Sequence, residues 1–281
     1  MLSGYAHAFK NRYNVSYLTY LKKYAIDLYL PCIYFSVVYW GLKYFLLQAD
    51  NSANFHTVSL KQLYLIPFQG FNVYWFLCEL FFIKMLHTVL ECKIRSVYFI
   101  SVVLLALFLF SYFFCKSMET FTIRCLYFHA GYLLRRMNYI SQAKHPPLIF
   151  GLILFQAGLL CFIADYFFSC SNIFTGAGAA FFMSIALFII FYAVCVKNKI
   201  LRICGLYSMV IYCLHDYIFA FLRIVFNFLP LSAYIDPFLL FSLCLVLSVC
   251  LPVLFALAYT NLKCFRWIEY IFYPGKLLLK K

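Results

Sequence analysis

The side chains best suited to chemistry lie in an apolar stretch at residues 205–226, GLYSMVIYCLHDYIFAFLRIVF. Plotted on a helix at about 100° per residue, its polar members share an arc of roughly 100°: Ser208, Tyr212, His215, Asp216 and Arg223. A histidine can act as a general base near neutral pH, because its unperturbed pKa is about 6.5. The spacing therefore predicts either a reactive site that positions a substrate hydroxyl or carbonyl, or a hydrogen-bond network between helices.

A second polar arc lies at residues 72–90. It covers roughly 120° of a helix and contains Asn72, Trp75, Phe76, Glu79 and His87. Glu79 is expected either to stay neutral through desolvation or to pair with Arg124 or Arg223, because an unpaired buried charge would cost several kcal/mol. The sequence allows two roles for Glu79, a structural ion pair or a part in catalysis. Arg124 is expected to face the interior, whereas His129 points about 140° away from it and is expected to be a packing residue.

Helices in a membrane must hold these side chains. The chain is 66% hydrophobic and 11% charged, whereas a soluble domain is roughly half apolar and about a quarter charged. This predicts an integral membrane protein and no nucleic-acid partner, despite the net charge of +14. Apolar spans occur at residues 24–47, 72–90, 96–114, 120–134, 147–166, 176–196, 205–226 and 237–260. The connections are short, so residues 1–281 are expected to form a single all-α bundle in the lipid bilayer.

The basic residues indicate the topology of this bundle. With the N-terminus inside, the outer segments contain Lys61 and Lys116, while most other lysines and arginines fall in inner segments. This follows the positive-inside rule. The sequence therefore predicts a polytopic protein of about eight transmembrane helices with both termini cytoplasmic. Residues 264–281 are expected to form a cytoplasmic tail, whose aromatics and lysines suit the membrane interface.

Five short motifs follow one another along the chain. They are LSGYAHAF at residues 2–9, the basic run Lys22-Lys23 with Pro31 downstream, YWFL with LF at residues 74–81, FHAGYLLRR at residues 128–136, and GLYS with IY and His215 at residues 205–215. In this order and spacing they resemble the acyltransferase-3 family of multispanning membrane O-acyltransferases. The likeness is closest to its fucose 4-O-acetylase-like branch.

The resemblance implies transfer of an acyl group, in the first place acetyl, from acyl-CoA in the cytoplasm to a sugar hydroxyl of a cell-surface glycan. The protein would lie in the plasma membrane, in a bacterium the inner membrane. Acetyl-CoA or another acyl-CoA would be a co-substrate, and no bound cofactor is expected. The expected catalytic residues are His215, Glu79 and Asp216, with Arg124, Arg223, Tyr212, Trp75 and Ser208 binding the substrates. No metal site is expected, because the histidines lack paired ligand spacing.

The family pattern differs at the N-terminus. Family members have about ten spans, and the first carries a histidine linked to catalysis, whereas this chain begins at what resembles the end of the second. The expectation is therefore that this histidine is missing, through a misassigned start, a truncated gene or decay to a remnant. Two other functions are open: a polysaccharide transporter, flippase or polymerase, and a non-catalytic remnant or partner subunit. Few glycines and prolines interrupt the spans, which counts against transport.

Overall fold

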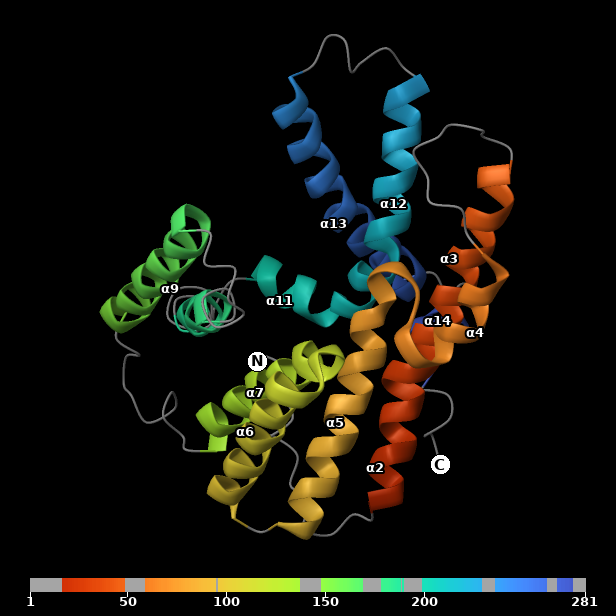
Figure 1. Ribbon diagram of the computed structural model, residues 1–281. Helices are drawn as coiled ribbons and strands as arrows, with labels where there is room; N and C mark the ends of the chain where they lie inside the picture. Colours follow the sequence, from red (N-terminus) through yellow and green to blue (C-terminus); the bar gives the residue numbers. More distant parts are fainter. Residues whose placement is uncertain are drawn as a thin grey trace. The chain divides into compact units, whose positions relative to one another are not determined.

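The fold is helical throughout the part of the chain that the computed structural model describes. This part comprises residues 17–48, 59–94, 96–136, 148–168, 178–187, 189, 199–228, 236–261 and 267–274. These residues contain no strand, which confirms the predicted all-α class (Figure 1). Every apolar span predicted from the sequence coincides with, or contains, a described helix.

The helices follow one another with short connections. In chain order they are α2 (Tyr17–Tyr24), η1 (Ala25–Tyr29), α3 (Leu30–Gln48), α4 (Leu60–Gln69), η2 (Asn72–Tyr74), α5 (Trp75–Lys93), α6 (Val97–Phe114), η3 (Lys116–Met118), α7 (Glu119–Arg136), α9 (Leu148–Phe168), Gly178–Leu187, α11 (Lys199–Leu206), α12 (Ser208–Phe228), α13 (Pro237–Asn261) and α14 (Glu269–Phe272). Among the described residues, three helices are long and apolar enough to cross a membrane: Tyr17–Tyr44, Val97–Phe114 and Phe238–Asn261. The count of about eight crossings and the cytoplasmic termini stay predictions.

The first described helix runs without a break from α2 through η1 into α3, and η1 is a turn of π-helix. In this turn the Leu30 N–H bonds the carbonyl of Ala25, five residues earlier. Pro31 follows directly. Its ring would collide with the carbonyl of Asp27 in a regular α-helix, and it has no N–H to donate. The wider turn accommodates both effects, so Pro31 accounts for the local change of helix type.

The chain divides into two compact units, the first made of Met1–Tyr17 and Ile83–Asn198, the second of Leu18–Phe82 and Lys199–Lys281. In the first unit α6 and α7 lie side by side (Figure 1). α6 buries one stripe of residues at helical spacing, namely Ile100, Leu104, Phe108 and Ser111. The hydroxyls of Ser111 and Thr122 lie 2.6 Å apart and join the two helices.

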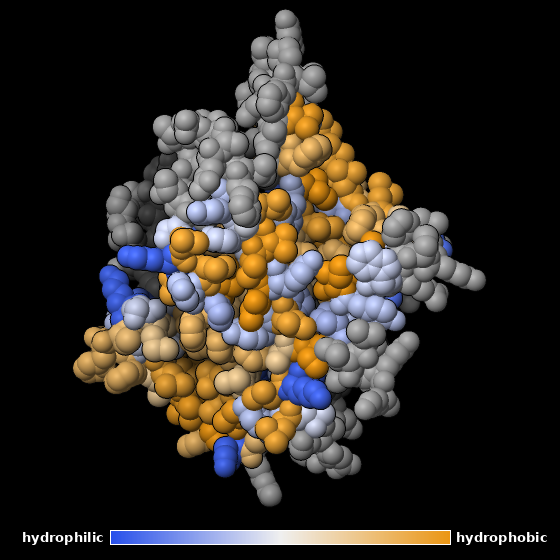
Figure 2. Space-filling view, turned by 90° about the vertical axis from the view of Figure 1, so that its right-hand side faces the viewer, coloured by the Kyte–Doolittle hydropathy of each residue, from blue (hydrophilic) through white to orange (hydrophobic). Residues whose placement is uncertain are grey.

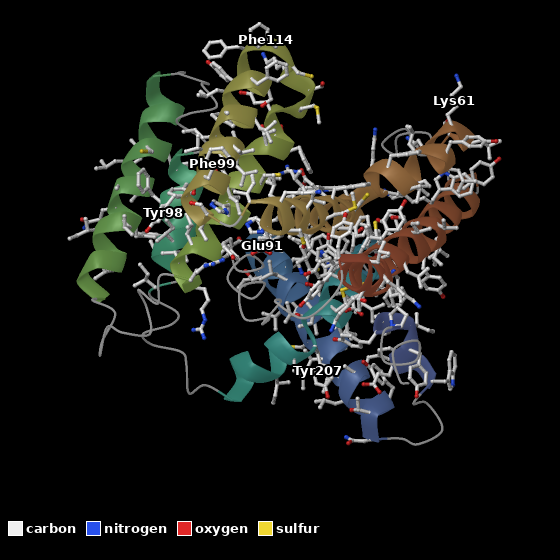
Figure 3. All side chains as sticks on the ribbon, turned by 90° about the horizontal axis from the view of Figure 1, so that it is seen from below. Lys61, Glu91, Tyr98, Phe99, Phe114 and Tyr207 are labelled. Carbon is white, nitrogen blue, oxygen red and sulfur yellow. The ribbon has the colours of Figure 1, made fainter. Side chains whose placement is uncertain are left out.

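The opposite face of α6 is exposed and apolar, with Val102, Leu105, Leu109 and Phe113 on it. A helix that is apolar all round must be surrounded by protein or by lipid, so this face is suited to the bilayer. Figure 3 shows Tyr98 and Phe99 near one end of α6 and Phe114 at the other, as expected for aromatic side chains at the two membrane interfaces. Hydrophobic residues also cover much of the face seen in Figure 2.

A glycine brings two further helices of the first unit together. A Cβ atom at Gly158 of α9 would lie 2.7 Å from the Met183 side chain and 3.2 Å from the Ala179 carbonyl oxygen of the helix Gly178–Leu187. Small residues allow such close approach between membrane helices. Phe181 of the same helix stacks on Tyr127 of α7, with ring centroids 5.7 Å apart.

The core of the second unit combines aromatic and small side chains from α3, η2, α5, α12, α13 and α14. Its buried members are Cys32, Phe35, Tyr39, Tyr74, Leu77, Cys78, Val210, Cys213, Ala256, Tyr259 and Phe272. Phe272 stacks on Phe35 at 5.3 Å and on Tyr259 at 6.3 Å between ring centroids. Residues 267–274 of the predicted C-terminal tail therefore pack on this core. Burial raises the pKa of Tyr273 to about 12, so its hydroxyl stays protonated and donates to the Leu206 carbonyl at 3.2 Å.

A tight turn at Gly70 joins α4 to η2 and α5. Gly70 has φ 66° and ψ 176°, a conformation that is nearly restricted to glycine. A Cβ atom there would lie 2.7 Å from the backbone nitrogen of Trp75. The turn directs the chain so that Tyr74 enters the core.

Replacement of Gly70 by alanine is expected to lower the melting temperature of the purified protein in detergent. The strained backbone alone costs about 1–3 kcal/mol, and the new methyl group would collide with Trp75. Gly41→Ala is the matched control, because no atom lies within 4 Å of its Cβ position and alanine favours helix. Equal melting temperatures for the two variants would contradict the proposed role of the turn.

Candidate functional site

Three tyrosine hydroxyls fasten α12 to its neighbours in the second unit. Each donates to a backbone carbonyl of another element: Tyr74 to Cys213 at 2.7 Å, Tyr217 to Phe35 at 3.0 Å, and Tyr212 to Val73. The ring of Tyr212 also lies 5.9 Å from that of Phe76. The segments 72–90 and 205–226, each singled out in the sequence for its polar arc, are therefore neighbours where α5 begins.

Asp216 lies close to polar side chains of α3. Its carboxylate acts electrostatically on the Tyr39 hydroxyl and on the Lys43 ammonium. The Lys43 nitrogen lies over the Tyr39 ring, 4.9 Å from its centroid, and 5.8 Å from the centroid of Phe71. We call Asp216, Tyr39 and Lys43 the Asp216 cluster. The sequence analysis did not select Lys43 as a site residue, although a lysine inside the apolar span 24–47 was a signal for it.

His215 presents one ring nitrogen to its own helix. Its Nδ1 lies 2.8 Å from the Tyr212 carbonyl oxygen and 3.2 Å from that of Ile211. A nitrogen in this position must carry the proton, because a carbonyl can only accept. In neutral His215 the lone pair is then on Nε2, away from the backbone. This is the tautomer that a general base on α12 needs.

The remaining predicted residues have varied surroundings. Ser208 is the exposed first residue of α12, and Trp75 is exposed at the start of α5. Glu79 of α5 is half-buried in the second unit, and Arg124 of α7 is half-buried in the first. Arg223 belongs to α12, but its side chain lies outside the described part of the structure. The roles predicted for these residues stay predictions.

The first unit holds a polar chain that the sequence analysis did not predict. His87 Nε2 lies 3.0 Å from His129 Nδ1, and His129 Nε2 lies 2.8 Å from the Ser101 hydroxyl oxygen. At the other end, His87 Nδ1 lies 3.8 Å from a carboxylate oxygen of Glu91. Both imidazoles are 2% exposed. We call Ser101, His129, His87 and Glu91 the histidine chain. His129, expected to be a packing residue, is bonded through both ring nitrogens.

Aromatic and basic groups surround the histidine chain. The Tyr132 ring lies 4.6 Å from that of His87, and its hydroxyl accepts a bond from Arg136 at 2.5 Å. Lys93 ends α5, while Arg135 and Arg136 end α7, and Figure 3 shows Glu91 at this end of α5. Within the described residues no group of three or more His, Cys, Asp or Glu side chains could hold a metal ion.

A protein-family model described as an acyltransferase domain, that of acyltransferase-3, matches residues 1–257. The chain belongs to the acyltransferase-3 family. The match spans every residue of the Asp216 cluster and of the histidine chain, as well as His215. Members of this family are membrane proteins, so this chain is a membrane acyltransferase in its general class. No curated protein and no solved structure matches it.

Tyr74→Phe is expected to destabilise the second unit by about 1 kcal/mol, because it removes a buried hydrogen bond to Cys213. Tyr64→Phe is the control, since Tyr64 is 79% exposed and should tolerate the same change. Unfolding in detergent, followed by circular dichroism, measures both. A Tyr74→Phe protein as stable as Tyr64→Phe would show that this bond does not hold α12.

A double-mutant cycle tests the Asp216 cluster. Lys43→Met and Asp216→Asn should each destabilise the protein, because each leaves its former partner's polar group in a poorly hydrated site. The double variant should lose less than the sum of the two, by about 0.5–3 kcal/mol, as for coupled neighbours. Thermal unfolding of the three variants gives the coupling. Strict additivity would mean that the two side chains do not interact.

Proposed function

We propose that this protein transfers an acetyl group, or another short acyl group, from acyl-CoA in the cytoplasm to a sugar hydroxyl of a cell-surface glycan. The observation that carries the proposal is the family match over residues 1–257, which supplies the reaction class. The donor is soluble in the cytoplasm and the glycan is outside, so the enzyme belongs in the plasma membrane, in a bacterium the inner membrane.

The polar groups of α12 support the acceptor half of this reaction. A sugar hydroxyl is a weak nucleophile, and a base that takes its proton raises its reactivity. His215 has the appropriate tautomer, with Nε2 free of the backbone carbonyls that hold Nδ1. Asp216 and Glu79 are the further catalytic residues of the proposal. Tyr212, Trp75, Ser208, Arg124 and Arg223 are proposed to bind the sugar and to stabilise the oxyanion that forms on the acyl carbonyl.

The basic residues at the ends of α5 and α7 support a polyanionic donor. Lys93, Arg135 and Arg136 lie in the last turns of these helices. Coenzyme A carries several phosphate charges, which lysine and arginine bind well. The same residues also satisfy the positive-inside rule, so their number alone does not require a donor. Acyl-CoA is proposed as a co-substrate that dissociates, without any bound cofactor.

The proposal predicts transfer of labelled acetyl groups from acetyl-CoA to surface glycan in membranes that contain the protein. His215→Gln should lower this transfer by about 10²–10⁴-fold, the usual contribution of a general base. Glu79→Gln should lower it as well. Glycan-bound label and the amount of protein in the membrane are measured together. Ser242→Ala is the control, because the Ser242 hydroxyl bonds the Phe238 carbonyl of its own helix.

Two results would contradict the proposal in different ways. Normal transfer by both variants would show that the site is wrong while the reaction stands. No transfer from any acyl-CoA by the unmodified protein would refute the reaction. Movement of intact glycan across the membrane in that case would support the transporter alternative.

A further inference from the structure

The histidine chain has the geometry of an activated nucleophile. In enzymes with a serine nucleophile, a histidine lies within hydrogen-bond reach of the hydroxyl and a third group orients that histidine. Here His129 lies 2.8 Å from the Ser101 hydroxyl, and His87 lies 3.0 Å from the far side of the same ring. Glu91 stands behind His87 at 3.8 Å. All four residues belong to the first unit.

The carboxylate of Glu91 decides the direction of the protons along the chain. Its oxygen lies 3.8 Å from His87 Nδ1, too far for a hydrogen bond, and its negative charge favours the tautomer of His87 with the proton on Nδ1. The Nε2 of His87 then accepts from His129 Nδ1. His129 consequently has its lone pair on Nε2, which faces the Ser101 hydroxyl. One assignment of protons therefore satisfies the hydrogen bonds between the two histidines and between His129 and Ser101, and it leaves a base beside Ser101.

The same chain can hold one more proton. With both nitrogens of His87 protonated, Nε2 donates to His129 Nδ1 and the positive ring lies 3.8 Å from the Glu91 carboxylate, so the proton of His129 moves to Nε2. The Ser101 oxygen can accept this bond, because its own proton has a second acceptor in the Val97 carbonyl at 3.2 Å. Ser101 is thus bonded in both states. A proton taken from Ser101 can be stored on the two histidines.

The histidine chain is buried, and it lies near the ends of α5 and α7 that carry Lys93, Arg135 and Arg136. Phe128 and Tyr132 of α7 lie against the His87 ring at 5.2 Å and 4.6 Å between centroids. Among the described residues, Glu91 of α5 lies beside His87, the Tyr132 ring of α7 packs against both histidines and its hydroxyl accepts a bond from Arg136, and α6 contributes the uncharged Ser101. Glu91 keeps 14% of its side chain exposed, whereas the two imidazoles are 2% exposed.

From this geometry we infer that Ser101 is a nucleophile that accepts the acyl group from acyl-CoA, with His129 as its base and His87 and Glu91 as positioning residues. The inference deepens the proposed function and rests on it. The Ser101 oxygen attacks the thioester carbonyl, a carbon–oxygen bond forms, and the carbon–sulfur bond breaks. The Ser101 proton passes to His129 Nε2 and from there to the departing thiolate, which leaves as free coenzyme A thiol.

The second step returns Ser101 to its first state. A hydroxyl oxygen of the acceptor attacks the ester carbonyl and gives up its proton, which is passed on to His129. The bond between the carbonyl carbon and the Ser101 oxygen breaks, and Ser101 recovers its proton from His129. No oxidant, reductant or further reactant is needed. The acyl-serine ester separates the donor reaction from the acceptor reaction.

The test uses the full chain in lipid nanodiscs with acetyl-CoA labelled in the acetyl group and no acceptor. The unmodified protein should release thiol in one rapid turnover and carry the label on a peptide that contains Ser101. Ser101→Ala should lose the label. Ser101→Cys should retain it as a thioester, which hydroxylamine cleaves at neutral pH. His129→Gln should slow labelling by about 10²–10⁴-fold. Glu91→Gln should slow it at saturating donor without raising the KM for the donor.

Ser111→Ala is the matched control, because Ser111 also lies on α6, is buried, and bonds both a carbonyl of its own helix and α7. It should label normally. Label that persists in Ser101→Ala, or full transfer to glycan by Ser101→Ala, overturns the role of Ser101 and leaves the proposed function intact. Absence of both thiol release and transfer in the unmodified protein overturns the proposed function, and the acyl-serine step with it.

Discussion

Lipid cannot form hydrogen bonds, and this constraint governs where polar side chains lie in the protein. Inside a bilayer each polar group must find its partner within the chain. The Tyr74 hydroxyl donates a hydrogen bond to the Cys213 carbonyl of α12, and the hydroxyls of Ser111 and Thr122 bond each other. The two ring nitrogens of His129 are hydrogen-bonded to His87 and to Ser101. Among the described residues, some polar side chains therefore bond between helices and others bond carbonyls of their own helix, while the apolar face of α6 is left for the bilayer.

The same constraint produces two polar centres of different chemistry. The Asp216 cluster in the second unit combines a carboxylate, a phenol and an ammonium, with His215 on the same helix. Such groups can form charge-assisted hydrogen bonds. The histidine chain in the first unit is drier and carries a serine hydroxyl against a base.

The positions of the helices could be predicted from the sequence better than the side-chain contacts between them. The apolar spans gave the helices because apolar runs of this length have few alternatives in a membrane. The sequence singled out residues 72–90 and 205–226 for their polar arcs, and the bond from Tyr74 to Cys213 joins these two segments. The pairing of His87 with His129 was not expected. Each histidine taken singly has an ordinary position on a helix, and no local spacing links two residues on separate helices.

The sequence by itself determined the helical class, the membrane character and the family, since composition, apolar periodicity and short ordered motifs are local properties of the chain. Tertiary structure decided which polar residues meet. The fold brought Asp216 of α12 close to Lys43 and Tyr39 of α3. It also placed Ser101, an unremarked residue of an apolar span, beside His129. Helix packing brings together residues whose separation in sequence carries no trace of that contact, so only the folded chain reveals them.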